Sequence, residues 1–336
     1  MGEDFIYKNK EIEYKKYKII TQTPVHIGSG EKISEKNYYY DQKTNEFIVP
    51  GEELYEILEK TNKIKEFIES MEKGLKISDF LIRNQKVLEE LKKTNVLKIE
   101  AAEEKQNDLM ISLLQKTNNL PYIPGSSIKG MIKTALYYHF YKKDIRLEKI
   151  LELEDPKYEN MHMFNNLIVR DFLPLKPIKT KVYKLNRIEK GQEYKKRISQ
   201  YFECIPPKSE FLGEIGIGKD FKIFGEVFNH ENMMKWIKEY FADVREDEGY
   251  EINEPQNMAH IKIGFGKGVF ANSILLAIKQ KNPAKFKEII KKSYKHYKKA
   301  KEKDIMDKFP KTRWRYTLNE YANDDYPDAL FLLSEE

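Results

Sequence analysis

The pattern that most constrains this chain is a short apolar run that enters a Pro-Gly turn and then a helical stretch, and it occurs twice. Residues 122–130 read Tyr-Ile-Pro-Gly-Ser-Ser-Ile-Lys-Gly, and Ile128, Ile132 and Leu136 then recur with helical spacing. Residues 47–54 have the same layout.

A hairpin-like pair of strands is predicted at residues 178–185 and 201–205, a helix at 233–242 and an acidic loop at 243–253. The strand-like and helical runs follow no regular βα repeat, so we expect an α+β fold with mostly antiparallel sheets.

The two copies differ in the charge of the first helical turn. In the second copy Ser126 or Ser127 is predicted to cap the helix, and Lys129 and Lys133 follow without any acid. A helix N-terminus with unpaired N–H groups suits a phosphate. The first copy carries two glutamates there, which satisfy the helix dipole and repel phosphate. The contrast predicts an anion-facing role for the second copy only; the alternative is a capped core helix with solvated lysines.

Two further glycine loops each follow a strand-like run. Residues 24–30 read Pro-Val-His-Ile-Gly-Ser-Gly, and residues 263–268 read Ile-Gly-Phe-Gly-Lys-Gly. Glycines let backbone N–H groups approach a polyanion closely. The later loop fits neither a dinucleotide fingerprint, because its third glycine comes one residue early, nor a P-loop. One such loop is usually only a turn, but three in a basic chain indicate polyanion binding.

Positive charge is concentrated in two segments. Residues 279–315 hold 15 Lys and Arg against 4 Asp and Glu, and residues 176–197 hold 9 against 2, in a chain of net charge +6. The remainder is therefore acidic, and the two segments are predicted to contact a polyanion. Near the end, Arg313, Trp314 and Arg315 alternate cation and aromatic as in single-stranded RNA contacts. The alternative there is a strand of period two with one buried face.

In combination and order, the three glycine motifs resemble those of the RAMP superfamily of CRISPR proteins, and most of all the family of fifth subunits of type III-A Csm effector complexes. The resemblance implies two ferredoxin-like, RRM-related modules. The first would span residues 1–175, with a helical insertion at about 52–120. The second would span residues 176–336 and contain the late glycine loop and basic C-terminal helices.

The resemblance also implies a function. The chain would bind crRNA, cap its 3′ end beside the backbone RAMP subunit and the small helical subunit, and assist 3′ maturation by host trimming nucleases without cutting. The expected location is the cytoplasm. Two alternatives stay open: a Cas6-like, metal-independent endoribonuclease that uses His26, or another RAMP subunit of the same complex.

Sequence patterns predict no catalytic group, cofactor or metal site, because the histidines form no ligand motif and Cys204 is the only cysteine. Cys204 is expected to be buried in a strand. No apolar run reaches membrane-span length and no signal peptide is recognised, so no membrane partner is expected. The predicted RNA-binding residues are His26, Gly28, Ser29, Gly30, Gly125, Ser126, Ser127, Lys129, Lys133, Arg187, Arg197, Gly264, Gly266, Lys267, Gly268, Arg313, Trp314 and Arg315.

Overall fold

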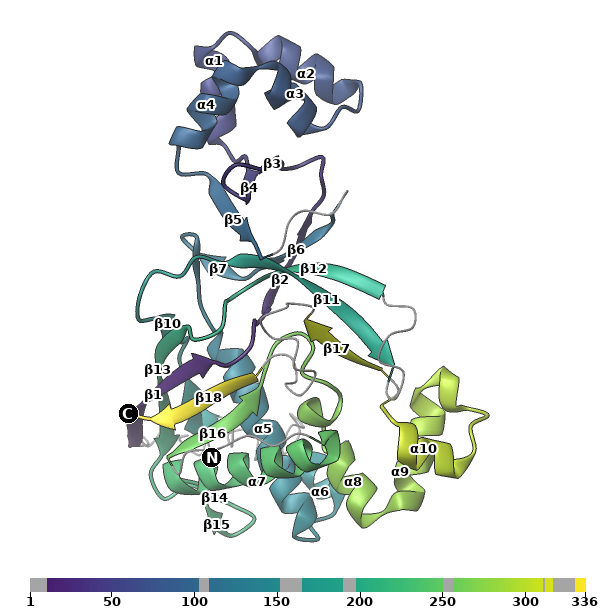
Figure 1. Ribbon diagram of the computed structural model, residues 1–336. Coiled ribbons are helices and arrows are strands. Elements are labelled where there is room, and N and C mark those ends of the chain that lie inside the picture. Colours follow the sequence, from purple (N-terminus) through teal and green to yellow (C-terminus); the bar gives the residue numbers. More distant parts are fainter. Residues whose placement is uncertain are drawn as a thin grey trace, which may run out of the picture.

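The fold consists of two β-sheets, helices packed against one of them, and a helical insertion at the far end of the other (Figure 1). The computed structural model describes residues 11–102, 109–151, 165–189, 198–249, 257–310, 312–316 and 330–336. Both sheets draw strands from either side of residue 175. The chain therefore crosses between the sheets several times.

The first sheet is six-stranded and has the order β10-β13-β1-β18-β16, with β9 also paired to β13. All of its pairs are antiparallel. Along β1 the side chains of Tyr17, Ile19 and Thr21 are fully buried, which is the period of two expected when one sheet face lies on a core. Its strands are β1 (Ile12–Thr21), β9 (Leu167–Val169), β10 (Leu173–Pro174), β13 (Glu210–Gly218), β16 (Met258–Lys262) and β18 (Leu330–Glu335).

The second sheet is eight-stranded and has the order β2-β6-β12-β11-β5-β4-β3, with β17 also paired to β11. The pairs β5–β11 and β6–β12 are parallel and the others are antiparallel. The prediction of an α+β fold with mostly antiparallel sheets is confirmed. The strands are β2 (Gly28–Ile33), β3 (Tyr39–Asp41), β4 (Glu46–Val49), β5 (Leu97–Ala101), β6 (Ile111–Leu114), β11 (Lys181–Glu189), β12 (Ile198–Cys204) and β17 (Thr312–Tyr316).

The main hydrophobic core lies between the first sheet and the helices that follow it. In α5 (Gly125–Lys142) the buried Ile128, Ile132 and Leu136 confirm the helical spacing. The other elements on this side are α6 (Leu147–Leu151), α7 (His230–Glu248), α8 (Leu275–Lys281), α9 (Pro283–Ser293), α10 (Glu302–Lys308), the 3-10 helices η3 (Phe270–Asn272) and η4 (Lys295–Tyr297), and the small hairpin β14 (Lys222–Ile223) and β15 (Glu226–Val227).

Helix α7 is longer than the sequence indicates. The acidic stretch from residue 243 was expected to form a loop, but it continues the helix to Glu248. The reason is Val244, which is fully buried, so this stretch still has an apolar residue on its core face. Asn229 caps the start by accepting from the Asn232 N–H at 2.8 Å, and Gly249 ends the helix with φ of 73°.

The helical insertion is shorter than the predicted span of 52–120. Its helices end at residue 93, and β5, β6 and the small hairpin β7 (Lys116–Thr117) and β8 (Leu120–Pro121) follow. In β5 the burial alternates, with Ile99 and Ala101 inside, and this period of two favours a strand. A separate apolar core holds the helices together. They are α1 (Glu53–Lys60), α2 (Ile64–Glu72), α3 (Ile77–Arg83) and α4 (Gln85–Lys93).

Candidate nucleic-acid interface

The first glycine motif is built around a buried histidine. After β1 the chain forms a β-bridge between Val25 and Ile205, with N–H to O distances of 2.9 and 2.8 Å. The next residue, His26, is 4% exposed, and its Nδ1 lies 2.7 Å from the backbone oxygen of Glu203. Since a carbonyl oxygen only accepts, Nδ1 carries the proton and donates it. The ring packs against Phe202 at 4.8 Å.

The lowered pKa of His26 is consistent with a buried, uncharged ring. Burial lowers the pKa of this imidazole below its usual value, and the bond and charge of Glu203 oppose that effect only in part. The other ring nitrogen faces Gly28, where a Cβ atom would come within 2.8 Å of Nε2. Gly28 therefore leaves room for the ring, and the packed role of His26 is the one that the geometry favours.

Residues 28–30 form the start of β2, an end strand of the second sheet. All three are exposed, and the register with β6 shifts between Gly28 and Lys32. Ser29 donates from Oγ to the Leu113 backbone oxygen at 3.2 Å, and Gly30 has φ of 90° with open space around it. A bulged end strand presents backbone N–H groups to the outside, where a polyanion can reach them.

The late glycine loop lies directly against the first one. The Phe265 N–H donates to the backbone oxygen of His26 at 2.8 Å. At Gly264 a Cβ would come within 2.5 Å of that same oxygen, and φ is 83°. Only glycine meets both conditions. Gly266 and Gly268 also have positive φ, 86° and 84°.

Lys267 is the cation of this loop. Its side chain is half-buried, and burial lowers the pKa of its amine. Within the part of the chain that the structure describes, it makes no ion pair. A partly desolvated ammonium group without a carboxylate gains strongly from a phosphate, so Lys267 is the best placed lysine of the candidate interface.

The third glycine motif begins α5, and here the sequence prediction is wrong in one respect. The helix starts at Gly125 with Pro124 as N-cap, so neither Ser126 nor Ser127 caps it with a side chain. Instead, the Gly125 N–H donates to Asp171 Oδ1 at 2.7 Å. The chain thus supplies its own carboxylate to the N-terminus that was expected to be open to phosphate.

This motif still lies near the other two. Gln115 donates its backbone N–H to the Ile27 oxygen at 2.8 Å, and its side-chain amide donates to Tyr122 Oη at 2.5 Å, three residues before the helix. On the first turns of α5, burial and then the charge of Lys133 lower the pKa of Lys129. Lys129 and Lys133 are both half-buried. Gly125 itself is required by packing, because a Cβ there would come within 2.3 Å of the Val169 oxygen.

The cation–aromatic segment near the end of the chain lies in strand β17. It pairs with β11, placing Trp314 opposite Arg187, which is exposed. Trp314 is half-buried and packs against Phe265 at 5.1 Å. The segment is therefore a strand whose tryptophan packs on the late glycine loop, and its contact with RNA stays a prediction. Arg313 and Arg315 flank it in the strand, and Arg197 lies outside the described residues.

A buried carboxylate beneath the loops was not anticipated. Glu203 on β12 has a side chain 1% exposed and pairs with Lys116, whose side chain is 11% exposed. It also accepts from Thr180 Oγ1 at 2.5 Å and from the Leu114 N–H at 3.0 Å. Its only sequence signal was an acid within the apolar run Tyr201–Ile205. Cys204, the next residue, is buried as predicted.

The basic C-terminal helices carry two kinds of lysine. Lys279 and Lys287 pair with Asp247 and Glu302, at 2.5 and 2.6 Å. Others around η4 are exposed and have no acidic partner among the residues that the structure places, so they remain available to a polyanion. These are Lys292, Lys295, Lys298 and Lys299.

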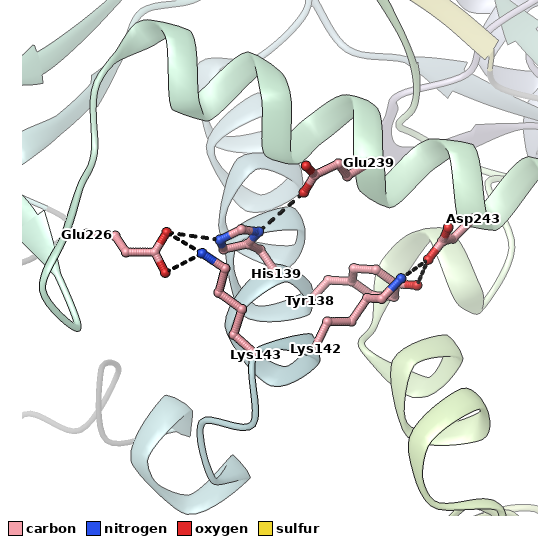
Figure 2. A network of polar contacts seen from close by, with 7 residues as sticks. All are labelled: Tyr138, His139, Lys142, Lys143, Glu226, Glu239 and Asp243. Carbon is pink, nitrogen blue, oxygen red and sulfur yellow. Dashed lines mark hydrogen bonds and ion pairs between the residues drawn. The ribbon is translucent and has the colours of Figure 1, made fainter.

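A separate polar cluster joins α5 to α7 (Figure 2). The His139 ring stacks on Trp236 at 4.4 Å and lies 3.4 Å from Glu226 and 3.3 Å from Glu239. Burial alone would raise the pKa of Glu226, but its bonds to Lys143 and His139 outweigh this and lower that pKa. The cluster holds α5 against α7, and so fixes the direction in which the third glycine motif points.

On the next turn of the same face, Asp243 accepts from both Tyr138 and Lys142. Burial, and then Asp243, raise the pKa of the Tyr138 hydroxyl far above its usual value. A cavity of about 420 Å³ opens here, and Lys142 and Asp243 in its wall form an ion pair with each other. It is lined by Tyr138, His139, Lys142, Lys143, Lys235, Trp236, Glu239, Ala242 and Asp243.

The described residues contain neither a metal-ligand cluster nor a membrane-spanning helix. No group of three or more His, Cys, Asp or Glu there could hold a metal ion. None of the helices placed by the structure is long and apolar enough to span a membrane.

The comparisons with known proteins agree with one another. The model of the RAMP superfamily matches residues 18–271. A protein of Enterococcus italicus named CRISPR system Cms protein Csm5 is 26% identical over 208 residues, which cover 54% of this chain and 53% of that protein. A Methanocaldococcus jannaschii protein of the same name is 28% identical over 159 residues, covering 42% and 34%. The chain thus spans about half the length, or less, of these curated relatives.

Solved structures show the same fold. A chain in the cryo-EM structure of a Csm–crRNA–target RNA ternary complex of a type III-A CRISPR-Cas system aligns with a TM-score of 0.67 and 19% identity, covering 96% of this chain and 100% of that one. The crystal structure of T. onnurineus Csm5 aligns with a TM-score of 0.56 and 19% identity, covering 79% and 94%.

Proposed function

Because the chain belongs to the RAMP superfamily, we propose that it is the Csm5-type, crRNA-binding subunit of a type III-A Csm effector complex. The observation that carries this proposal is the junction of two glycine loops around the buried His26, with the half-buried Lys267 beside it. The similarity to Csm5 proteins supports the same assignment. The complex would act in the cytoplasm.

The interface would hold RNA by its backbone. Exposed residues 28–30 offer N–H groups at a bulged strand, and Lys267 offers a cation that lacks a carboxylate partner in the described chain. The exposed lysines around η4 would extend the contact along the strand. None of these groups reads a base edge, so the binding is expected to depend on charge and shape more than on sequence.

The finer role that we propose is to cap the 3′ end of the crRNA, beside the backbone RAMP subunit and the small helical subunit. Host nucleases would trim the exposed end, and this chain would not cut. The state of His26 supports a non-cutting role, because the ring is buried and its Nδ1 proton is engaged by the Glu203 oxygen. A general acid or base must instead reach the proton that it transfers.

A salt titration of crRNA binding tests the proposal. Affinity should fall steeply between about 50 and 200 mM salt, and Lys267→Ala should reduce the log–log slope by about one, since one phosphate contact is lost. Lys73→Ala removes an exposed lysine from the helical insertion and serves as the control, with an unchanged slope.

The RNA recovered from the same titration, run without metal, should be intact. A slope near zero would refute the polyanion interface. Defined fragments that vanish in His26→Gln would instead favour the endoribonuclease.

A further inference from the structure

The helical insertion is a distinct body at one end of the molecule. Figure 1 shows α1–α4 beyond β3 and β4, at the opposite end from helices α5–α10. Its apolar core is separate from the main one and includes Leu58, Phe67, Phe80 and Leu88. A body with its own core can present a surface far from the candidate RNA interface.

One face of this body exposes large apolar side chains. Tyr55 on α1 is 63% exposed, and Ile64 and Ile68 on α2 are 38% and 48% exposed. The Tyr55 ring packs edge-on against the buried Phe67 at 6.3 Å. On α2, Ile64 is four residues before Ile68 and three before Phe67, so it lies beside both, and Tyr55 also contacts Phe67. We call Tyr55, Ile64 and Ile68 together the insertion face. Clustered exposed apolar residues commonly mark an interface.

The charge of the segment that carries the insertion face is opposite to that of the candidate RNA interface. Residues 52–72 carry seven glutamates and three lysines, in a chain of net charge +6. One of the lysines, Lys63, is already paired with Glu66 at 2.5 Å. Such a surface repels phosphates, so RNA is a poor occupant. The complementary surface is apolar at its centre and rimmed by Lys and Arg.

We propose that the insertion face docks a neighbouring protein subunit of the effector complex through an apolar contact with a basic rim. This inference rests on the proposed function, because it takes the partner from the same complex. The chain would then have two separate ends, one that contacts RNA through the glycine loops and one that contacts protein through Tyr55, Ile64 and Ile68.

The test places a photo-crosslinking amino acid, p-benzoylphenylalanine, at position 55 of the full chain within the reconstituted complex containing crRNA. Irradiation should yield one adduct with another protein subunit, identified by mass spectrometry of its peptides. An adduct with RNA, with a second copy or with the chain itself would overturn the proposal, and so would the absence of any adduct.

A charge-matched pair of variants completes the test. Tyr55→Glu/Ile68→Glu should lower incorporation into the complex by about tenfold or more, as expected for the loss of central apolar contacts. Lys73→Glu makes the same change of two charges on an exposed side chain outside the face and should leave incorporation unchanged. Equal incorporation of both variants would overturn the proposal.

The melting temperature and crRNA affinity of the isolated double variant should equal those of the wild type. Failure of the wild type itself to bind crRNA would instead contradict the proposed function, which keeps the two failures distinguishable.

Discussion

Replacing the buried Glu203 by glutamine should destabilise the protein strongly, although the two side chains have nearly the same shape. The Glu203 carboxylate is 1% exposed and neutralises Lys116, whose side chain is 11% exposed. Glutamine removes the negative charge and leaves the ammonium group buried without an ionic partner. The amide also turns a donor toward either the Leu114 N–H or the Thr180 hydroxyl, both of which now donate to the carboxylate.

The size of the destabilisation follows from the cost of leaving one buried charge without its ionic partner. Removing one partner of a buried ion pair typically costs about 3–5 kcal/mol. Since glutamine retains one oxygen acceptor, we expect the lower end, about 3 kcal/mol in the free energy of unfolding. The measurement is urea unfolding followed by far-UV circular dichroism, with the slope of the transition compared between variants.

A second substitution separates charge from packing. Lys116→Met in the Glu203→Gln background removes the orphaned cation and should restore at least about 1 kcal/mol, a coupling that a double-mutant cycle measures. A loss below about 1 kcal/mol in Glu203→Gln, or no recovery in the double variant, would refute the reasoning. Either result would mean that water or local rearrangement already solvates Lys116.

Two further predictions concern His26 and the first turn of α5. As the pH falls from about 7.5 to about 5, the melting temperature should drop. The reason is that histidine in the unfolded chain takes up a proton from about pH 6.5 downwards, whereas burial lowers the pKa of His26 in the folded protein. His26→Gln should therefore make the melting temperature less dependent on pH. An unchanged pH dependence would exclude a buried, neutral His26. Lys129→Glu should weaken crRNA binding by about 1–3 kcal/mol in a filter-binding assay, while Glu53→Lys in the acidic copy should leave it unchanged; equal effects would contradict the charge contrast.

Much of the fold could be predicted from local pattern. Helical spacing of Ile128, Ile132 and Leu136 predicted α5, and two strand-like runs predicted the β11–β12 hairpin. The errors lay where local pattern is weak. The insertion was predicted to be helical to residue 120 because β5 and β6 are only five and four residues long, too short to show a clear period of two in the sequence. The end of α7 was not predicted because its last turns are mostly charged and contain a single buried apolar residue, Val244.

The sequence alone determined which residue types the three glycine motifs contain, because glycine, lysine and the absence of acids are local properties. The tertiary structure decided which groups pair with these residues and how deeply they are buried. The chain itself brings the Asp171 carboxylate to the Gly125 N–H and the Glu203 oxygen to the His26 ring, from 46 and 177 residues away. Spacing along a chain cannot reveal such partners, because burial and pairing depend on strands that meet only in the folded sheets.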